Sequence, residues 1–326
     1  MNSDKMDAAR EVLEAEVRIR PYIRETPLEP SPGFGGDADA RVFFKCENLQ
    51  HTGSFKARGA LSKALSLSRE ALDRGVVTAS TGNHGAACAF ALDVVGARAT
   101  VFVPETASPA KVANVERLGG AIRRHGTDSG ETEAFARAYA DENGLTYLPP
   151  YNDPQVIGGQ GTTALEICRQ LEHVDAVVVA VGGGGLIAGI AAHLNSVSPG
   201  TRVIGCSPEN SQVMIQSVNA GRIVDLPSRP TLSDGTAGGV EPDAVTFPVV
   251  RELVADFVTV TEAEIAAAMR AFMGVHAMMI EGSAGVAIAA YLKTRARWAG
   301  KNVVVVLCGA NIDLQTLRGV LKHEGG

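Results

Sequence analysis

The stretch Ala176-Val-Val-Val-Ala-Val-Gly-Gly-Gly-Gly185 decides the fold of this chain. Its six apolar residues show no polar alternation, which is typical of a strand covered on both faces within a parallel sheet. Four glycines follow at once, and Leu186–Leu194 then has the composition of a helix. The stretch therefore predicts a strand, a tight turn and a helix, the repeating unit of an α/β protein.

Val-rich runs and Ala-rich helical stretches alternate through most of the 326 residues, which indicates an α/β fold with doubly wound, mostly parallel sheets. The predicted strands are Val42–Cys46, Val76–Ala79, Ala99–Val103, Ala121–Arg124, Ala176–Val181, Arg202–Cys206 and Val303–Leu307. The predicted helices are Asp4–Arg18, Ser54–Leu67, Asn83–Leu92, Pro109–Leu118, Glu131–Glu142, Gly159–Gln170, Leu186–Leu194, Glu262–Met273 and Ser283–Thr294.

The length predicts about two domains, at roughly 100–200 residues for each. The best boundary is Tyr147–Pro154, where three prolines lie between two helical patterns. The segment Gln212–Phe247 is rich in Gly, Ser, Asp and Pro, and we expect it to be irregular. Long loops of this kind often border a binding cleft.

The charge pattern argues against nucleic acid and membrane partners. With 30 Lys+Arg and 36 Asp+Glu, the chain has a net charge of −6 and lacks a long run of like charges. Its apolar runs are shorter than the ~18 residues of a membrane span, and Met1–Ser31 is charged rather than typical of a signal peptide. We expect a cytoplasmic protein whose partners are small molecules.

The cysteines indicate neither a disulfide framework nor a metal site. Five are present without a Cys-x-x-Cys pair, which argues against both disulfides and a zinc site. They are Cys46, Cys88, Cys168, Cys206 and Cys308.

The four glycines, Gly182, Gly183, Gly184 and Gly185, are the strongest local signal. Without Cβ atoms, backbone N–H groups can converge on an anion at a helix N-terminus. The loop has neither the Lys-Ser/Thr of a P-loop nor dinucleotide GxGxxG spacing. It indicates a phosphate site, with a tight strand-to-helix turn as the structural alternative.

A lysine lies in a second turn, Thr52-Gly-Ser-Phe-Lys-Ala-Arg-Gly-Ala60. Near the positive end of a helix dipole the charged form of Lys56 is disfavoured, which helps to supply a free amine for Schiff-base chemistry. Taken alone, a solvated surface lysine explains this pattern better.

A third turn, Ala79-Ser-Thr-Gly-Asn-His-Gly85, ends a strand with small and polar residues. Its amides and hydroxyls suit a carboxylate. Alternatively, Ser80 or Thr81 caps the following helix and His84 is a packed residue.

A fourth turn, Val303-Val-Val-Val-Leu-Cys-Gly-Ala-Asn311, delivers Cys308 at the end of a buried strand. No partner in the sequence would activate the thiol as a nucleophile. A buried structural cysteine is the simpler alternative.

Together the four turns resemble the fold-type II pyridoxal-phosphate enzymes, within them the serine/threonine dehydratase (ammonia-lyase) and serine racemase group. The resemblance covers nearly the whole chain. Its motifs are Glu47–Lys56, Ser80–His84, Gly182–Gly185, Glu281–Ser283 and Cys308–Asn311. It implies a tryptophan-synthase-beta-like fold, a large domain of residues 1–75 plus 153–326, a small inserted domain of residues 76–152 that closes over the substrate, and a homodimer.

The resemblance also implies roles for individual residues. Lys56 would bind pyridoxal 5'-phosphate as a Schiff base and remove the Cα proton, and Thr81 would be the second catalytic residue. The cofactor would be held by Phe55, Lys56, Asn83, Gly182, Gly183, Gly184, Gly185, Glu281 and Cys308. The substrate would be bound by Ser80, Thr81, Gly82, Asn83 and His84.

The implied activity is a carbon–oxygen lyase that removes water and ammonia from a β-hydroxy-α-amino acid, such as L-threonine or L-serine, to give a 2-oxo acid. Cys308 would lie beside the pyridine nitrogen, where a neutral thiol cannot keep that nitrogen protonated. The ring is then a poorer electron sink, which favours departure of the β-substituent.

Alternatives stay open at this stage. They are an amino-acid racemase, a dehydratase for phenylserine, hydroxyaspartate or a hydroxy-diamino acid, a β-replacement enzyme and a ligand-binding protein on the same scaffold. Racemases of the group carry Ser where this chain has Thr81, and the stiffer β-branched side chain weakens that alternative.

Other departures from the group concern metal, regulation and specificity. Ser207 and Val213 fall at the two carboxylate positions of the group's divalent-cation site, although Glu209 lies near, so we expect no metal. The chain ends at Gly326, soon after Asn311, so we expect no C-terminal allosteric domain. Glu131 falls where relatives that act on hydroxyaspartate or serine often carry Arg; it would repel a distal carboxylate if it faced the pocket, or else serve as a solvated helix-start residue.

Overall fold

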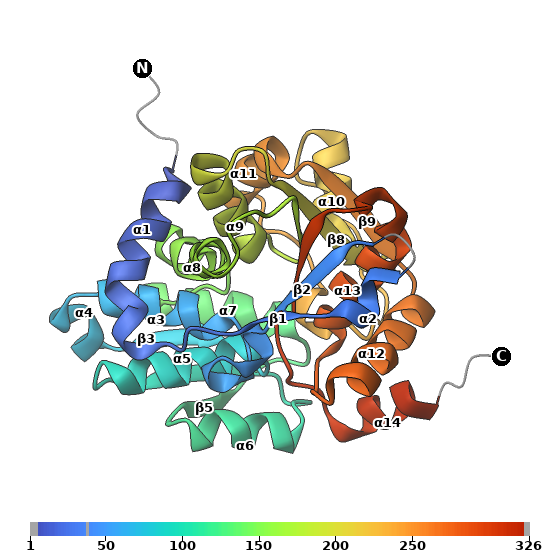
Figure 1. Cartoon of the computed structure of the whole chain (residues 1–326). Helices are drawn as coiled ribbons and strands as arrows, with labels where there is room; N and C mark the ends of the chain where they lie inside the picture. Colours follow the sequence, from blue (N-terminus) through green and yellow to red (C-terminus); the bar gives the residue numbers. More distant parts are fainter. Residues whose placement is uncertain (1–5, 37–38, 323–326) are drawn as a thin grey trace.

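The chain folds into two sheets that are connected through packed helices (Figure 1). The structure is a computed structural model, which describes residues 6–36 and 39–322. Two apolar cores surround the small sheet and one large core surrounds the large sheet.

The large sheet has six strands in the order β1-β2-β10-β7-β8-β9. Only β1 runs antiparallel, against β2. The bounds are β1 Leu28–Pro30, β2 Arg41–Lys45, β10 Asn302–Val306, β7 Ala176–Ala180, β8 Arg202–Pro208 and β9 Asp256–Val260. Every residue of β7 and β10 is buried, as expected for central strands covered on both faces.

The small sheet is parallel, with the order β5-β4-β3-β6. Its strands are β5 Ala121–Arg124, β4 Ala99–Val103, β3 Val76–Ala79 and β6 Thr146–Tyr147. All four come from within residues 76–147, whereas every strand of the large sheet comes from outside this range. The α/β class with mostly parallel sheets is therefore confirmed, and the exact domain limits stay a prediction.

The helices fill the faces of both sheets and the space between them. Their bounds are α1 Ala8–Ile19, α2 Pro32–Gly35, α3 Lys56–Ser66, α4 Arg69–Arg74, α5 Asn83–Val94, α6 Pro109–Arg117, α7 Ser129–Glu142, α8 Pro154–Gln170, α9 Gly185–Val197, α10 Val213–Ala220, α11 Thr246–Leu253, α12 Glu262–His276, α13 Gly282–Thr294 and α14 Leu314–Lys322.

Helix α8 links the two halves, because it packs against α1, α3 and α9 at once. Two glycines permit this close approach. A Cβ atom at Gly159 would lie 2.5 Å from the Arg58 carbonyl oxygen, and one at Gly161 would lie 2.9 Å from the Gly189 backbone. Larger side chains would force α8 away from α3 and α9.

A buried network of charges lies where α3 and α8 meet β2. The Arg58 guanidinium donates to Glu47 Oε2 at 2.7 Å and to Glu166 Oε1 at 2.8 Å, and Lys45 Nζ donates to Glu166 Oε2 at 2.6 Å. All four side chains are fully buried. Two cations and two carboxylates therefore satisfy one another directly behind the first turn of α3.

Several predicted element bounds were wrong. All seven predicted strands exist, within two residues of their expected ends, but β1, β6 and β9 were not predicted. Helices α2, α4, α11 and α14 were missed as well, and Gln212–Phe247 is not wholly irregular because it contains α10. Short edge strands and short helices carry too few periodic residues to be recognised from sequence.

Two helices begin at other residues than predicted, directly after the side chains that cap them. Asp4 and Lys5, the first residues of one predicted helix, lie outside the described residues; α1 begins at Ala8, with Asp7 accepting the Arg10 N–H at 3.0 Å. Helix α8 begins at Pro154 rather than Gly159, because Asp153 accepts the Val156 N–H at 3.1 Å. Both are side-chain N-caps of the usual kind.

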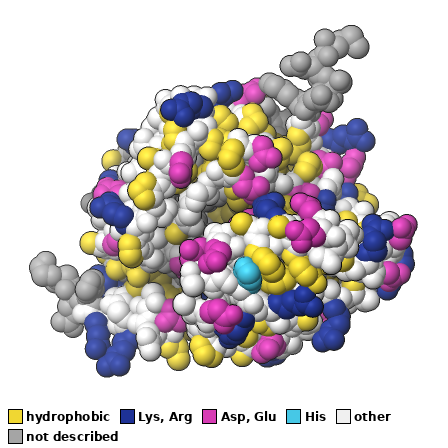
Figure 2. All heavy atoms as spheres, turned by 180° about the vertical axis from the view of Figure 1, so that it is seen from behind, with side chains coloured by type: hydrophobic (Ala, Val, Ile, Leu, Met, Phe, Trp, Pro, Cys, Tyr) yellow, Lys and Arg dark blue, Asp and Glu magenta, His cyan; other side chains and the backbone are white. Residues whose placement is uncertain are grey.

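Lys and Arg side chains are scattered among Asp and Glu over the face shown in Figure 2, and they form no single-sign field there. Among the described residues, no helix is both long and apolar enough to cross a membrane.

Candidate active site

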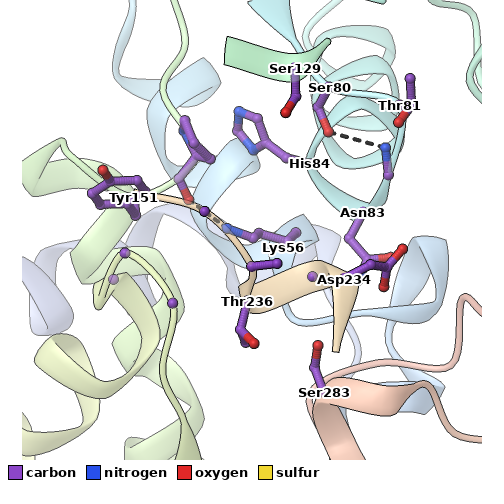
Figure 3. Close-up of a pocket in the computed structure, with 18 of the residues that line it drawn as sticks. Lys56, Ser80, Thr81, Asn83, His84, Ser129, Tyr151, Asp234, Thr236 and Ser283 are labelled. Atoms are coloured by element: carbon purple, nitrogen blue, oxygen red, sulfur yellow. Dashed lines mark hydrogen bonds between the residues drawn. The ribbon is translucent and has the colours of Figure 1, made fainter. Parts of the chain in front are cut away.

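A cavity of about 940 Å³ brings the four turns together (Figure 3). It falls within the range of ~300–1,000 Å³ that small-molecule sites usually occupy. Its lining includes every residue that the sequence assigned to the cofactor and the substrate. Segments that are distant in sequence therefore form one site, although the role of each residue stays a prediction.

Lys56 is the first residue of α3, and its side chain reaches into the middle of the cavity (Figure 3). Its Nζ donates to the carbonyl oxygen of Pro150 at 2.7 Å, and it has no carboxylate partner among the residues that the structure describes. Desolvation lowers the pKa of the Lys56 amine to about 8. A substantial fraction of the amine is therefore neutral near physiological pH, as a nucleophile or proton acceptor requires.

The preceding residues fix the position of Lys56. The Phe55 N–H donates to the Cys308 carbonyl oxygen at 3.1 Å, and Ser54 forms a bridge with Gly309. The turn after β10 therefore holds the turn before α3.

The glycine loop joins β7 to α9, with Gly184 at φ +88° directly before the helix. A Cβ atom at Gly183 would lie 2.4 Å from the ring of Tyr151, and one at Gly182 would lie 3.0 Å from Thr236. Among the described residues, the backbone N–H groups of Gly182–Gly185 donate to no protein acceptor. Such free amides at a helix N-terminus suit a phosphate.

A carboxyl group, Glu281, lies at another wall of the cavity. Both of its oxygens accept hydrogen bonds from Asn83 Nδ2, at 3.0 and 2.9 Å, and Oε2 also accepts the Asn311 N–H at 3.1 Å. The Cys308 thiol is 3.7 Å from Oε1. Burial raises the pKa of Glu281 to about 7, and burial also raises the pKa of the Cys308 thiol.

The loop before α5 presents small polar groups to the cavity. Ser80 Oγ accepts the Gly82 N–H at 3.1 Å, and Ser80 and Thr81 both face the open space (Figure 3). His84 differs, because its Nε2 is 3.0 Å from the Leu148 carbonyl oxygen and its side chain is almost fully buried. Burial, followed by the charge of Lys56, lowers the pKa of His84 to about 3, so the ring stays neutral.

The residues present fit pyridoxal phosphate. A lysine with a depressed pKa, a loop of free amides and a pair formed by Asn83 and Glu281 lie around one cavity of suitable size. An aldehyde requires a nucleophilic amine, a phosphate requires N–H donors, and a ring that bears a hydroxyl requires polar side chains at its edge.

Sequence reasoning missed several lining residues. They include Tyr151, Glu133 and Arg137, together with the segment 234–241. Tyr151 belongs to the proline-rich boundary, and residues 234–241 belong to the segment expected to be irregular. The composition of these two segments set them apart, but nothing in the sequence identified the individual residues as cavity-lining. Of the two possibilities for a long irregular segment, a cleft border or a surface excursion, residues 234–241 show the first.

Two departures can be placed in the structure. Glu131 is exposed, and its Oε2 accepts the Thr127 N–H at 2.7 Å, so it is a helix-start residue and does not line the cavity. Ser207 is buried and donates to the Val181 carbonyl oxygen at 3.0 Å. In residues 6–36 and 39–322, no three His, Cys, Asp or Glu side chains are grouped as a metal site would need.

Comparisons with known proteins agree with this site. A family model described as pyridoxal-phosphate dependent enzyme matches residues 19–309. An L-threonine ammonia-lyase of Geobacter sulfurreducens is 40% identical over 312 residues, covering 96% of this chain and 77% of that protein. A serine racemase of Arabidopsis thaliana is 39% identical over 332 residues, covering 99% and 100%.

Solved structures give the same result. Threonine deaminase isoform 2 from Solanum lycopersicum superposes with a TM-score of 0.93 at 34% identity, covering 100% of this chain and 95% of that one. Maize serine racemase superposes with a TM-score of 0.90 at 34% identity, covering 97% of each chain. This chain belongs to the family of pyridoxal-phosphate dependent enzymes.

Proposed function

We propose that the chain is a pyridoxal-phosphate-dependent ammonia-lyase that converts a β-hydroxy-α-amino acid, such as L-threonine or L-serine, into a 2-oxo acid and ammonia. The observation that carries the proposal is the Lys56 amine, which has a depressed pKa and lines one cavity together with the polar loop Ser80–His84 and the glycine loop Gly182–Gly185. Similarity to the threonine ammonia-lyase supports it.

When bound, the cofactor supplies an electron sink that makes the Cα proton of an amino acid acidic. Lys56 and the Gly182–Gly185 loop would hold its two ends, and Asn83, Phe55, Glu281 and Cys308 would border its ring. Ser80, Thr81 and the amides at the start of α5 would bind the substrate carboxylate.

The residues of the chain then divide the proton transfers. Lys56 Nζ accepts the Cα proton, because its pKa of about 8 leaves it partly neutral. The β-hydroxyl group takes up one proton and leaves as water, which balances the proton removed from Cα, and addition of a second water to the unsaturated amine product gives the 2-oxo acid and ammonia. Cys308 keeps its proton, so it offers the ring a neutral group rather than an anion.

Thr81 bears on the choice between elimination and racemisation. Racemisation needs an acid on the face opposite Lys56, and the β-branched Thr81 is restricted at χ1. We expect 2-oxo-acid release from an L-β-hydroxy amino acid to exceed formation of the D-enantiomer by at least about tenfold, a barrier difference of roughly 1.4 kcal/mol. Chiral chromatography together with keto-acid detection in one time course tests this. Equal rates would make racemase the better assignment.

A metal is not part of the proposal. Ser207 and Val213 offer no carboxylate, and a hard divalent cation needs several oxygen ligands. We expect a chelator to leave ammonia release and thermal stability unchanged. Saturable activation by Mg²⁺ or Ca²⁺ would overturn this part.

We further propose a cytoplasmic homodimer in which residues 76–152 form the domain that closes over the substrate. The exposed apolar side chains of Leu13 and Val17 on α1 support an association surface. Ion pairs between Lys111 and Asp234 and between Arg137 and Glu241 join residues 76–152 to the rest of the chain across the cavity. Light scattering and limited proteolysis with and without substrate test both points.

A further inference from the structure

One face of α7 contributes a row of polar side chains to the cavity. Ser129, Glu133 and Arg137 are spaced four residues apart and therefore lie on the same side of the helix. All three line the cavity that holds Lys56. The proposed contacts to the cofactor and to the substrate carboxylate include none of these three residues, so they can contact another part of the substrate.

Arg137 is paired with two carboxylates. Its Nη2 donates to Glu133 Oε1 at 2.8 Å and to Glu241 Oε1 at 2.9 Å, and its guanidinium lies 4.3 Å from the centre of the Tyr147 ring. The other Glu241 oxygen accepts a hydrogen bond from Asn152 at 2.9 Å. Two carboxylates therefore already compensate the charge of this cation, and among the described residues its Nη1 group has no hydrogen-bond acceptor.

Glu133 is engaged through one oxygen only. Its Oε1 accepts from Arg137 Nε and Nη2 and, at 3.3 Å, from the Tyr147 hydroxyl. Within the described part of the chain, Glu133 Oε2 accepts no hydrogen bond, and 34% of the side chain is exposed. Glu133 and Lys56 line the same cavity.

The cavity as a whole has more acidic than basic groups. Its described lining includes five carboxyl side chains and three cations. The carboxyl groups are Glu133, Asp234, Glu241, Glu281 and Asp313, and the cations are Lys56, Lys111 and Arg137. Lys111 is 3.0 Å from Asp234, so Lys56 is the only cation of this lining without a carboxylate partner.

From this arrangement we propose that Glu133, held in place by Arg137 and Glu241, determines specificity, selecting amino acids whose side chain ends in an ammonium group and rejecting those that end in a carboxylate. The triad carries one excess negative charge and one open acceptor oxygen. A distal ammonium would donate to that oxygen, whereas a distal carboxylate would meet like charge and, apart from Lys56, only cations that are already paired with carboxylates.

This inference deepens the proposed function, so its test separates binding from turnover. Three amino acids of similar length without a β-leaving group serve as probes of the holoenzyme: L-2,4-diaminobutyrate, L-2-aminobutyrate and L-aspartate. Calorimetry gives their dissociation constants in the wild type, in Glu133→Gln, and in Glu142→Gln as the matched control on an exposed position of α7.

We expect the diamino acid to bind at least about tenfold more tightly than L-aspartate, with the neutral probe between them. Glu133→Gln should reduce this ratio at least about threefold while changing the affinity for L-2-aminobutyrate less than about twofold. Glu142→Gln should leave all three constants unchanged. Tighter binding of L-aspartate, or an unchanged ratio in Glu133→Gln, would overturn the inference.

Ammonia release reports on the proposed function separately. We expect 2,4-diamino-3-hydroxybutyrate to have a higher kcat/KM than 3-hydroxyaspartate, with a difference that lies mainly in KM. If the binding order is observed but no β-hydroxy amino acid releases ammonia, the specificity inference stands and the ammonia-lyase proposal fails. If L-threonine and L-serine release ammonia but the binding order is not observed, the ammonia-lyase proposal stands and the specificity inference fails.

Discussion

Two cations of helix α3, Arg58 and Lys56, differ in whether a carboxylate pairs with them. Arg58, on the core side of α3, forms part of a buried network with Glu47, Glu166 and Lys45 in which charges of opposite sign are matched. Lys56, two residues earlier, points into the cavity, and within the described part of the chain its amine donates only to the Pro150 carbonyl oxygen. The Arg58 network anchors the start of α3, whereas the Lys56 amine is available as a nucleophile or proton acceptor.

The pKa values express this difference. The cations beside Glu166 lower its pKa to about 2 despite its burial, so it stays ionised. Glu281 is also buried, but its hydrogen-bond partners Asn83, Cys308 and the Asn311 N–H are neutral. Burial, with a smaller contribution from the charge of Asp234, therefore raises its pKa to about 7. Burial alone therefore does not decide the protonation state; the presence of a charged partner does.

The largest expected effect comes from removing the unpaired amine. Lys56→Ala should lower ammonia release at least about a thousandfold, because no other described lysine of the cavity is free to accept the Cα proton. Borohydride reduction of the wild type should fix the cofactor to Lys56, as peptide mapping would show. Lys63→Ala is the control, since that lysine lies on α3 but is paired with Asp153. Normal turnover by Lys56→Ala without added amine would contradict the assignment.

Removing the paired cation should instead affect stability. Arg58→Leu leaves two buried carboxylates short of donors, and we expect it to lower the free energy of unfolding by about 3–5 kcal/mol. Urea denaturation of the cofactor-free protein measures this, with Glu47→Gln as a milder variant if Arg58→Leu does not fold. The exposed pair of Arg74 and Glu70 gives the control, because Arg74→Leu should cost less than about 1 kcal/mol. Equal losses for both arginines would show that the buried network is no anchor.

Glu281 allows the comparison to be tested by pH. The fold raises its pKa from 4.5 to about 7, so the folded protein favours the protonated carboxyl group. The associated stability is complete below pH 4.5 and is lost as the pH rises through 7. Glu281→Gln stays neutral throughout. Between pH 4.5 and 7.5 the wild type should therefore lose on the order of 2 kcal/mol relative to Glu281→Gln in the cofactor-free protein. A constant difference between the two proteins across this range would mean that Glu281 is ionised throughout.

The part of the site that was predictable is local in sequence. The loop at Gly182–Gly185 and the turn around Lys56 each place a strand end, small residues and a helix start within about ten residues, so composition alone indicates their geometry. The α/β class follows from the same short-range patterns. Resemblance to the family was needed to interpret Lys56, which could have been a surface residue, as a predicted cofactor ligand.

The rest depends on contacts between distant segments. Lys45 meets Glu166 across 121 residues, and Arg137 meets Glu241 across 104. On α7, Glu133 and Arg137 have the i,i+4 spacing of an ordinary exposed ion pair, so nothing in the sequence distinguishes a cavity wall from a solvated face. The edge strands β1 and β6 are too short to show periodicity, and their pairing is decided by the neighbouring strands.

The smallest expected effect concerns Cys308. Substitutions there test whether activity requires a neutral side chain beside Glu281 or requires a thiol in particular. Burial raises the pKa of the thiol, so Cys308 is a neutral donor, as a serine hydroxyl would be. Cys308→Ser should therefore change kcat for ammonia release less than about threefold and leave the ratio of elimination to racemisation unaltered. Cys308→Asp would add a charge next to Glu281 and to the proposed position of the ring nitrogen, and it should shift that ratio toward racemisation. Cys168→Ser, away from the cavity lining, is the control for loss of a thiol. If Cys308→Ser were as damaging as Cys308→Asp, the thiol would have a role beyond neutrality, and the contrast between paired and unpaired charges would not be enough to explain this end of the site.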